Sequence, residues 1–206
     1  MIAAEQASPD SSTDSAVPAI PSELAARLAH PTVRLSGTID GLMAESFLRQ
    51  VAPILDTPGA ILVELFSQGG DADVGRRLAE EVRLLRQVHS RDMWFLGKTL
   101  IASAAVTFMA AFPREHRWLT SDATLLVHGR RMRREVQLEG PLGNCRRVLE
   151  EMIADIDNGL RIEEHGFAEL VEGSGVTLED VRRSAYGGWY LSARQALDIG
   201  LVAGVI

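Results

Sequence analysis

Three short stretches of the sequence carry residue types that together can perform acyl transfer. Ser103 opens an apolar segment, His128 follows an apolar run, and the pair Gly69-Gly70 follows another. Acyl transfer by serine needs a nucleophile, a base within reach, and amide donors where the oxyanion forms. Serine, histidine and glycine are residue types suited to these three tasks.

Ser103 is the candidate nucleophile. A serine at the first turn of a buried helix lies where free backbone amides and the positive end of the helix dipole stabilise a developing negative charge. Each stretch also has a plain structural explanation, because serine is a favoured helix N-cap, a glycine pair makes a tight turn, and a histidine at a strand end often only packs. The combination, with each stretch after its own apolar run, favours a catalytic site.

The expected secondary structure supports this grouping. Residues 60–66 are a nearly continuous apolar run, typical of a parallel strand covered on both faces, and apolar residues at helical spacing over 74–88 follow the glycine turn. The pattern repeats with a strand predicted over 93–96, a connection over 97–102 and a helix over 103–112. Two βα units in succession predict an α/β fold with a parallel sheet.

A further strand over residues 123–127 delivers His128 at its carboxyl end. In open α/β sheets, ligands and catalytic groups gather at the carboxyl ends of the strands. We therefore expect residues 67–71, Ser103 and His128 to meet at one edge of the sheet. Short strands over 33–35 and 117–119 complete this part of the sheet.

The second half of the chain predicts a helical arm. A long helix is expected from Leu142 to about His165, followed by a shorter helix over 167–171. One apolar stripe runs along the long helix: Leu142, Cys145, Leu149, Met152, Ile156 and Leu160. This segment exceeds what a crossover needs, so we expect an arm over about 135–175 that packs on another subunit.

Two capping-box patterns follow the arm. Thr177 with Asp180 predicts the start of a helix that runs to residue 185, and Ser192 with Gln195 predicts another that ends at Gly200. A strand over 189–191 precedes the second helix, and an apolar run closes the chain.

The composition bounds the function classes. The 206 residues fit one domain over 23–206, preceded by a leader over 1–22 that is rich in Ala, Ser, Pro and Asp and is expected to be disordered. A formal net charge of −7 argues against nonspecific nucleic-acid binding. A single cysteine excludes an intrachain disulfide, and no apolar run has the length of a membrane span. We expect a cytoplasmic protein that uses no cofactor or metal and binds no membrane.

The order and spacing of four motifs resemble the proteolytic subunit of the Clp protease. These motifs are the segment Ser67–Gly70 after an apolar strand, Ser103 before an apolar helix, His128, and the closing segment Tyr190–Val202. The resemblance runs from about Val33 to the end of the chain and implies a crotonase-like ββα spiral fold and a serine peptidase.

Site roles follow from this resemblance. It makes Ser103 the nucleophile and His128 the general base, with the backbone amides of Gly70 and Ala104 as the oxyanion hole. It also implies an extended peptide substrate, a homo-oligomer of stacked rings joined by the arm, and an unfoldase ATPase as a possible partner.

The chain departs from the family at the third triad position. The family has an aspartate two residues before the aromatic of the closing motif, and this chain has Gly188 there. Asp180, Glu179 or a backbone carbonyl are the alternatives for orienting the histidine. The run Arg130–Arg134 is also outside the family pattern and is expected to be a solvated or subunit-contact salt-bridge segment, or a site for acidic peptide.

Three readings therefore stay open. The first is a serine peptidase that works through Ser103 and His128. The second is a noncatalytic subunit or scaffold, which Gly188 favours. The third is a different enzyme of the same fold, either a coenzyme A thioester enzyme or a Ser-Lys peptidase, for which Lys98 is the single available lysine.

Overall fold

The computed structural model describes residues 22–206, so the leader expected over 1–22 lies outside the described residues except for its last position. The first element is helix α1 (Ser22–Ala29), which the sequence patterns did not indicate. It buries Leu28 against Leu62 and Leu96 of the sheet, and the Arg27 guanidinium lies 4.8 Å from the ring centroid of Trp94.

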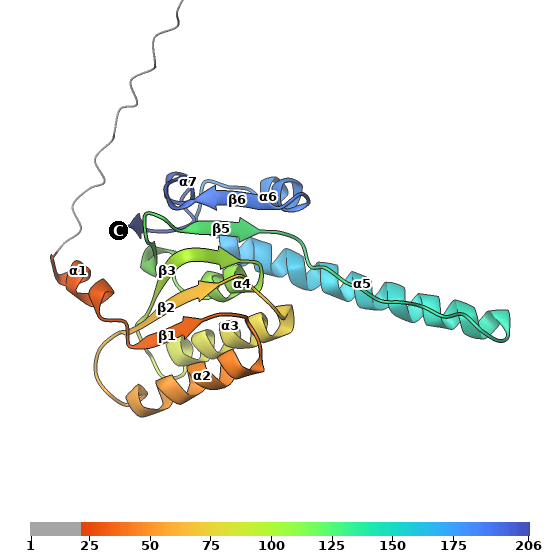
Figure 1. The fold of residues 1–206 in the computed structure, drawn as a ribbon, viewed down its shortest axis with the longest axis horizontal. Helices are drawn as coiled ribbons and strands as arrows, with labels where there is room; N and C mark the ends of the chain where they lie inside the picture. Colours follow the sequence, from red (N-terminus) through yellow and green to blue (C-terminus); the bar gives the residue numbers. More distant parts are fainter. Residues whose placement is uncertain (1–21) are drawn as a thin grey trace, which may run out of the picture.

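Within residues 22–206 one seven-stranded sheet organises the chain (Figure 1). Parallel pairing runs through β1 (Val33–Ser36), β2 (Ile61–Ser67), β3 (Met93–Ala102), β4 (Arg117–Leu119) and β7 (Gly204–Val205). The remaining two strands are β5 (Thr124–Val127), parallel to β3, and β6 (Trp189–Ser192), antiparallel to β5.

Strand β3 is longer than expected, and its two halves pair with two different strands. Residues 95–97 pair with β4, whereas residues 100–102 pair with β5. The prediction of a connection over 97–102 is therefore wrong, because neighbouring strands on both sides bind this segment through their backbones. The polar residues Lys98 and Thr99 hid the strand from the hydrophobic pattern, and Thr99 has a positive φ of 57°.

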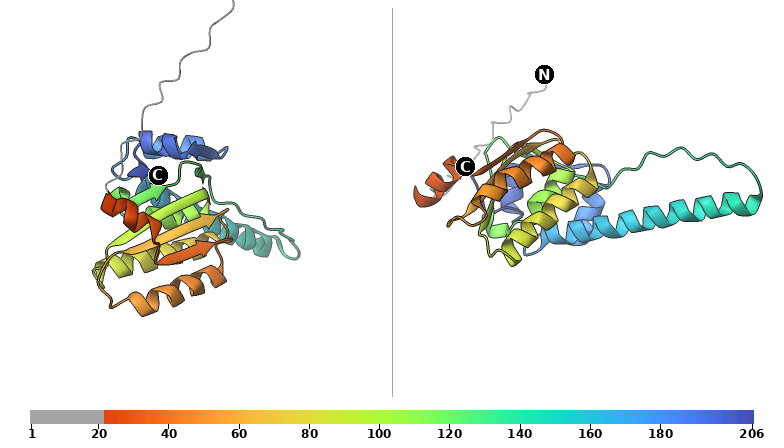
Figure 2. Two further views of the ribbon diagram at one scale, coloured as in Figure 1. Left: turned by 60° about the vertical axis from the view of Figure 1, so that its left-hand side comes forward. Right: turned by 90° about the horizontal axis from the view of Figure 1, so that it is seen from below.

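Helices cover one face of the sheet (Figures 1 and 2). They are α2 (Gly41–Val51), continued by the 3-10 turn η1 (Ala52–Ile54), then α3 (Ala72–Gln87) and α4 (Ala104–Ala110), with η2 (Arg114–His116) leading into β4. The Asp40 carboxylate caps α2 by accepting from the Met43 N–H at 3.0 Å.

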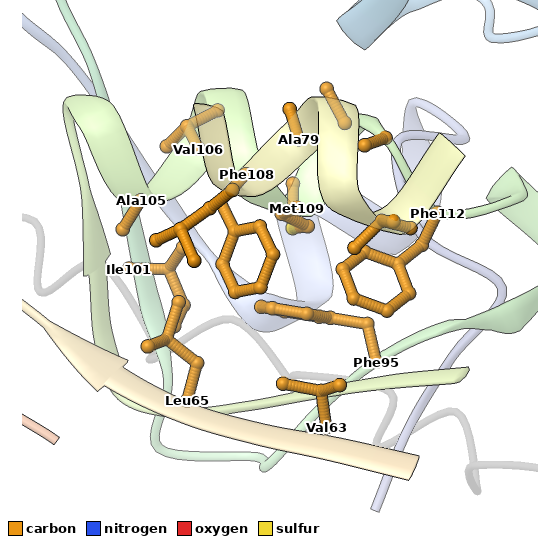
Figure 3. Packing of buried hydrophobic residues seen from close by; sticks show 14 of the residues in the cluster. Val63, Leu65, Ala79, Phe95, Ile101, Ala105, Val106, Phe108, Met109 and Phe112 are labelled. Atoms are coloured by element: carbon orange, nitrogen blue, oxygen red, sulfur yellow. The ribbon is translucent and has the colours of Figure 1, made fainter. Parts of the chain in front are cut away.

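Aromatic side chains fill the space between this layer and the sheet (Figure 3). Phe108 and Phe112 of the α4 segment are fully buried, with ring centroids 5.5 Å apart. Phe112 also lies 5.3 Å from Phe95 of β3, and Phe108 lies 5.7 Å from Phe47 of α2, centroid to centroid. This packing fixes α4, and with it the residue that precedes α4, against the centre of the sheet.

Helix α5 (Leu142–Val171) is one continuous helix of 30 residues that projects from the sheet, while the chain between β5 and α5 runs back along it (Figures 1 and 2). The protruding arm is thus present. The prediction of a separate helix over 167–171 is wrong: Gly166 weakens a helix without ending it, since a glycine costs only about 1 kcal/mol. Only Phe167 and Leu170, in the last turns of α5, are fully buried.

The closing elements follow the expected order. Helix α6 (Leu178–Ala185) begins at the capping box of Thr177 with Asp180, and α7 (Ala193–Asp198) begins at that of Ser192 with Gln195. Both capping boxes are confirmed. No helix in the described part of the chain combines the length and hydropathy needed to cross a membrane.

Candidate active site

A cavity of about 610 Å³ lies at the carboxyl ends of β2, β3 and β5, between α3 and the C-terminal half of α5. Gly70, Ser103, Ala104 and His128 all line it. The structure therefore brings to one place three separate segments that the sequence singled out: Gly70, the pair Ser103-Ala104, and His128. Parallel pairing explains this meeting, because it brings the carboxyl ends of neighbouring strands to the same edge.

Ser103 stands at a sharp turn between β3 and α4. Its φ of 56° and ψ of −119° are unusual for a residue with a side chain. The turn is held by backbone bonds, since the Ser103 N–H donates to the Leu126 carbonyl at 2.8 Å and the Ser103 carbonyl accepts from the Val106 N–H at 2.9 Å. The hydroxyl caps no amide of α4, so the simple N-cap explanation does not hold. A strained strand-to-helix turn is how hydrolases present a nucleophilic serine.

The glycine turn is built to present a backbone amide. The Ile39 N–H donates to the Gly69 carbonyl at 2.9 Å and the Asp71 N–H donates to the Ile39 carbonyl at 2.8 Å. In a parallel ladder, this pattern turns the N–H of the residue between them, Gly70, away from Ile39. A Cβ on Gly69 would lie 2.8 Å from the Ser103 Cβ, so only glycine allows this approach.

A buried serine supports the turn. The Ser67 side chain is fully buried at the end of β2, and its Oγ accepts a hydrogen bond from the Gly69 N–H at 3.0 Å. Gly70 and Ala104 both line the cavity together with Ser103. Two backbone amides beside a serine are what an oxyanion hole requires, so their role as its donors stays a prediction.

His128 lies next to Ser103 because β5 pairs with β3. The register places Leu126 beside Ala102. Ser103 is the first residue after β3, and His128 is the first residue after the adjacent β5. The Nδ1 of His128 lies 2.7 Å from the Gly129 carbonyl oxygen. A carbonyl only accepts, so Nδ1 donates its proton and the neutral ring keeps a lone pair on Nε2. This is the tautomer in which Nε2 acts as a base.

Gly188 lies across from His128. The β5–β6 register pairs Val127 with Trp189, and its next step sets Gly188 opposite the histidine. Gly188 has no side chain, its φ is +89°, and a Cβ built there would lie nearest to Leu126 and Tyr190, at 3.7 and 3.9 Å. The Gly129 carbonyl binds Nδ1 instead, which is the backbone alternative that the sequence left open.

Asp180 does not orient the histidine. Its carboxylate accepts from the Thr177 hydroxyl at 2.6 Å within the capping box and also binds the Arg183 guanidinium. The Thr177 hydrogen bond is the main reason that the pKa of Asp180 lies below its usual value. Asp180 is absent from the cavity wall, and Glu179 pairs with Arg182 at 3.4 Å. Both carboxylates thus serve α6, which corrects their suggested role at the site.

One absent hydrogen bond and one ion pair bear on the chemistry. Within residues 22–206 no hydrogen bond joins the Ser103 hydroxyl to the His128 ring. The Lys98 ammonium binds the Glu64 carboxylate at 2.6 Å and does not line the cavity. The structure therefore does not bring a lysine to Ser103.

Charged side chains form the outer wall of the cavity. Arg130 binds Asp73 at 2.9 Å, and this hydrogen bond is the chief cause of the lowered pKa of Asp73. Farther along the arm, Arg134 binds Asp155 at 2.9 Å, so two arginines of the run form salt bridges within the chain.

Glu163 was missed by the sequence analysis. Its carboxylate accepts a hydrogen bond from the Arg130 N–H beside His128. No spacing signal relates a residue of the long helix to a histidine so far away along the chain.

Comparison with known proteins adds to this geometry. No family model matches the chain. ATP-dependent Clp protease proteolytic subunit 2 of Treponema pallidum is 26% identical over 176 residues, which are 84% of this chain and 81% of that protein. Proteolytic subunit 3 of Rhizobium etli is 23% identical over 85% of this chain and 83% of its own length. Proteolytic subunit 2 of Pseudomonas aeruginosa is 24% identical over 84% and 80%.

A solved structure shows the same fold. A mutant of ClpP1 from Listeria monocytogenes superposes with a TM-score of 0.69 over 89% of this chain and 95% of that one, at 19% sequence identity. The expected crotonase-like α/β fold is confirmed by this likeness together with the parallel sheet and its helices. Similarity in sequence and in fold therefore identifies the chain as a ClpP-like protein.

Proposed function

We propose that this protein is a serine-type peptidase that hydrolyses unfolded peptide chains. Ser103 Oγ attacks the peptide carbonyl carbon while His128 Nε2 takes the hydroxyl proton, and the amides of Gly70 and Ala104 bind the oxyanion. The protonated His128 then gives its proton to the leaving amine. Water then attacks the acyl carbon while His128 Nε2 takes a proton from it. The protonated His128 returns that proton to Ser103 Oγ as the acyl group leaves.

One observation carries this proposal: a strained, uncapped serine shares a cavity with a histidine whose Nδ1 is already committed as a donor. Backbone strain of this kind persists only where the surrounding structure enforces it, and it concentrates at active sites. The names of the curated relatives, all proteolytic subunits, support the same reaction class.

The substrate class follows from the shape of the site. An extended peptide that lies beside the glycine turn can exchange main-chain hydrogen bonds with it, which gives affinity with little dependence on sequence. The relatives are named as subunits of an ATP-dependent protease, and we propose that an unfoldase ATPase supplies such peptides from unfolded proteins inside the cell.

We also propose that the protein works as a homo-oligomer of stacked rings. Along α5, six large apolar side chains are exposed in the single chain: Val148 and, at helical spacing, Leu142, Leu149, Ile153, Ile156 and Leu160. A continuous apolar stripe of this kind indicates a protein partner, and a second copy of the same arm has the matching surface.

Labelling with a fluorophosphonate probe tests the proposed chemistry. The probe forms a covalent bond with an activated serine, so the expected adduct maps to Ser103 and disappears in Ser103→Ala. It should also be lost in His128→Ala and retained in Lys98→Ala. An adduct on another residue, or labelling that survives His128→Ala unchanged, contradicts the proposal.

A noncatalytic subunit is the second candidate, because no carboxylate stands opposite His128 and no hydrogen bond joins the imidazole to Ser103 in the described chain. That function predicts an intact oligomer that does not label. A Ser-Lys peptidase loses support because Lys98 is paired with Glu64.

A further inference from the structure

Glu163 lies on α5 in the wall of the cavity that Ser103 and His128 share. Its carboxylate accepts a hydrogen bond from the Arg130 backbone N–H. A Cβ added to Gly129 would come within 3.1 Å of Glu163 Oε2. A half-buried carboxylate thus contacts the backbone that directly follows the candidate base, and the reaction proposed above does not use it.

This contact reaches the imidazole through a single peptide group. The Gly129 carbonyl and the Arg130 N–H belong to the same peptide unit, whose amide end binds Glu163 and whose carbonyl end accepts from His128 Nδ1 at 2.7 Å. Hydrogen bonds in a chain polarise one another, so negative charge at the amide end makes the carbonyl a stronger acceptor. The carboxylate therefore favours the proton on Nδ1.

Asp71 also lines the cavity and caps α3, whereas the remaining acids of the wall bind side-chain cations. Asp73 binds Arg130 at 2.9 Å and lies 3.6 Å from Arg76, while Glu169 binds Arg83 at 2.6 Å and lies 3.5 Å from His165. Arg131 also lines the cavity. Glu163 differs from these acids because its hydrogen bond ends on the peptide unit that holds the histidine.

We propose that Glu163 is the positioning residue of this site. Acting through the Gly129–Arg130 peptide group, it holds His128 in the Nδ1–H tautomer and thereby takes over the task that an aspartate at Gly188 would perform. The proposal rests on the proposed serine peptidase function. It assigns the role of the third triad member to a residue of α5 instead of the residue that precedes β6.

The variant Glu163→Gln tests it, because the glutamine keeps an oxygen that can accept from the Arg130 N–H but removes the charge. Glu163→Asp keeps the charge, and Glu164→Gln is the control. Glu164 is the next residue on α5, pairs with Arg182, and does not line the cavity. Two quantities are measured: the rate of Ser103 labelling by a fluorophosphonate across a pH series, and the imidazole nitrogen chemical shifts of His128, assigned by their loss in His128→Ala.

We expect Glu163→Gln to label roughly tenfold more slowly, a part of the roughly 10²- to 10⁴-fold that a positioned base contributes. Its pH midpoint should fall, because a nearby negative charge favours the imidazolium and is now missing. The His128 nitrogen shifts should move toward the Nε2–H tautomer. Glu163→Asp should restore part of the rate, and Glu164→Gln should match the unmodified protein.

Labelling of Glu163→Gln at the unmodified rate, with the same pH midpoint and the Nδ1–H tautomer retained, overturns the proposal. The carboxylate then only supports the backbone. If Ser103 does not label even in the unmodified protein, the peptidase function fails. The nitrogen shifts still decide the role of Glu163 in that case, since they need no reaction: a shift toward Nε2–H in Glu163→Gln supports it and an unchanged spectrum overturns it.

Discussion

Ser103 is strained in a way that few other residues share. Within residues 22–206, positive φ in a residue with a side chain occurs at three positions, and the other two are Ser90 and Thr99. Such a conformation costs about 1–3 kcal/mol and persists when neighbouring contacts enforce it. Here the bonds to Leu126 and Val106 do so. The strained turn at the end of β3 is thus the same turn that places Ser103 in the wall of the cavity.

Gly188→Asp tests whether the site lacks only a directly bonded carboxylate. The added side chain would stand across from His128, so we expect Ser103 labelling and peptide hydrolysis to accelerate by part of the roughly 10⁴-fold that the aspartate of a complete triad supplies. The positive φ at this position subtracts about 1–3 kcal/mol from stability. Rates are compared with Gly188→Asn, which imposes similar strain without charge. Equal rates in the two variants would contradict the expectation.

Ser67→Ala tests the support of the glycine turn. The substitution leaves the buried Gly69 N–H without its acceptor, so the free energy of unfolding should fall by about 1–3 kcal/mol. Labelling of Ser103 should slow as the Gly70 amide loses its fixed position. Urea unfolding and labelling rates measure the two effects, with the exposed Ser121→Ala as the control. Unchanged stability would show that the turn does not depend on this hydroxyl.

At the scale of elements, Arg117 joins the ends of two helices from its place on β4. Its guanidinium is almost fully buried and donates to the carbonyls of Ala110 and Phe112 at 2.8 and 2.9 Å and of Leu170 at 3.2 Å. These carbonyls lie at the C-terminal ends of the α4 and α5 segments, where backbone acceptors lack helical partners. Burial lowers the pKa of Arg117 to about 10.

Arg117→Lys should destabilise the fold, because one ammonium cannot reach carbonyls that a planar guanidinium spans. We expect the free energy of unfolding to fall by about 1–3 kcal/mol for the acceptors left without a donor. The urea midpoint measures this, with Arg194→Lys, an exposed ion pair, as the control. In the unmodified protein the pKa of Arg117 is lower in the folded state, so the unfolded chain binds the proton more tightly. The free-energy cost of burying the charged guanidinium therefore declines only as the pH rises above about 10. A midpoint equal to that of the control would contradict the bridging role.

The elements also show what the sequence determined and what it concealed. Apolar periodicity and capping residues sufficed for α3, α6 and α7, because these signals are local. The second half of β3 was missed because Lys98 and Thr99 interrupt the apolar pattern while pairing with β2 and β5 holds the strand together. The continuity of α5 through Gly166 was missed because a glycine locally indicates the end of a helix. The helical turns on both sides outweigh its small cost.

The candidate site was predictable to a similar extent. Parallel strands carry Gly70, Ser103 and His128 to one edge, and that grouping follows from the order of strands and turns. The partners of the histidine do not follow from it. The Gly129 carbonyl and the Glu163 carboxylate depend on how the chain turns after β5 and on the path of α5 beside it, which no local pattern encodes.

At the scale of the whole molecule, the arm projects away from the sheet (Figure 2), and the described residues leave its large apolar side chains exposed. Ile153→Asp should reduce the proposed oligomer to smaller species, because a charge on this stripe opposes burial against another subunit. Light scattering measures the mass, and Asn158→Asp, on another face of α5, is the control. A stable monomer in the unmodified protein, or an unchanged mass in Ile153→Asp, would contradict the proposed assembly through the arm.

The central claim is that Ser103 forms an acyl-enzyme with a peptide substrate. Intact mass spectrometry of the assembled protein, taken at short times after mixing with an activated peptide ester, measures this intermediate directly. We expect a mass increase equal to the acyl group, located on Ser103, that decays as product accumulates and is absent in Ser103→Ala. An assembled and folded protein that never acquires this mass, or that acquires it equally in Ser103→Ala, would contradict it.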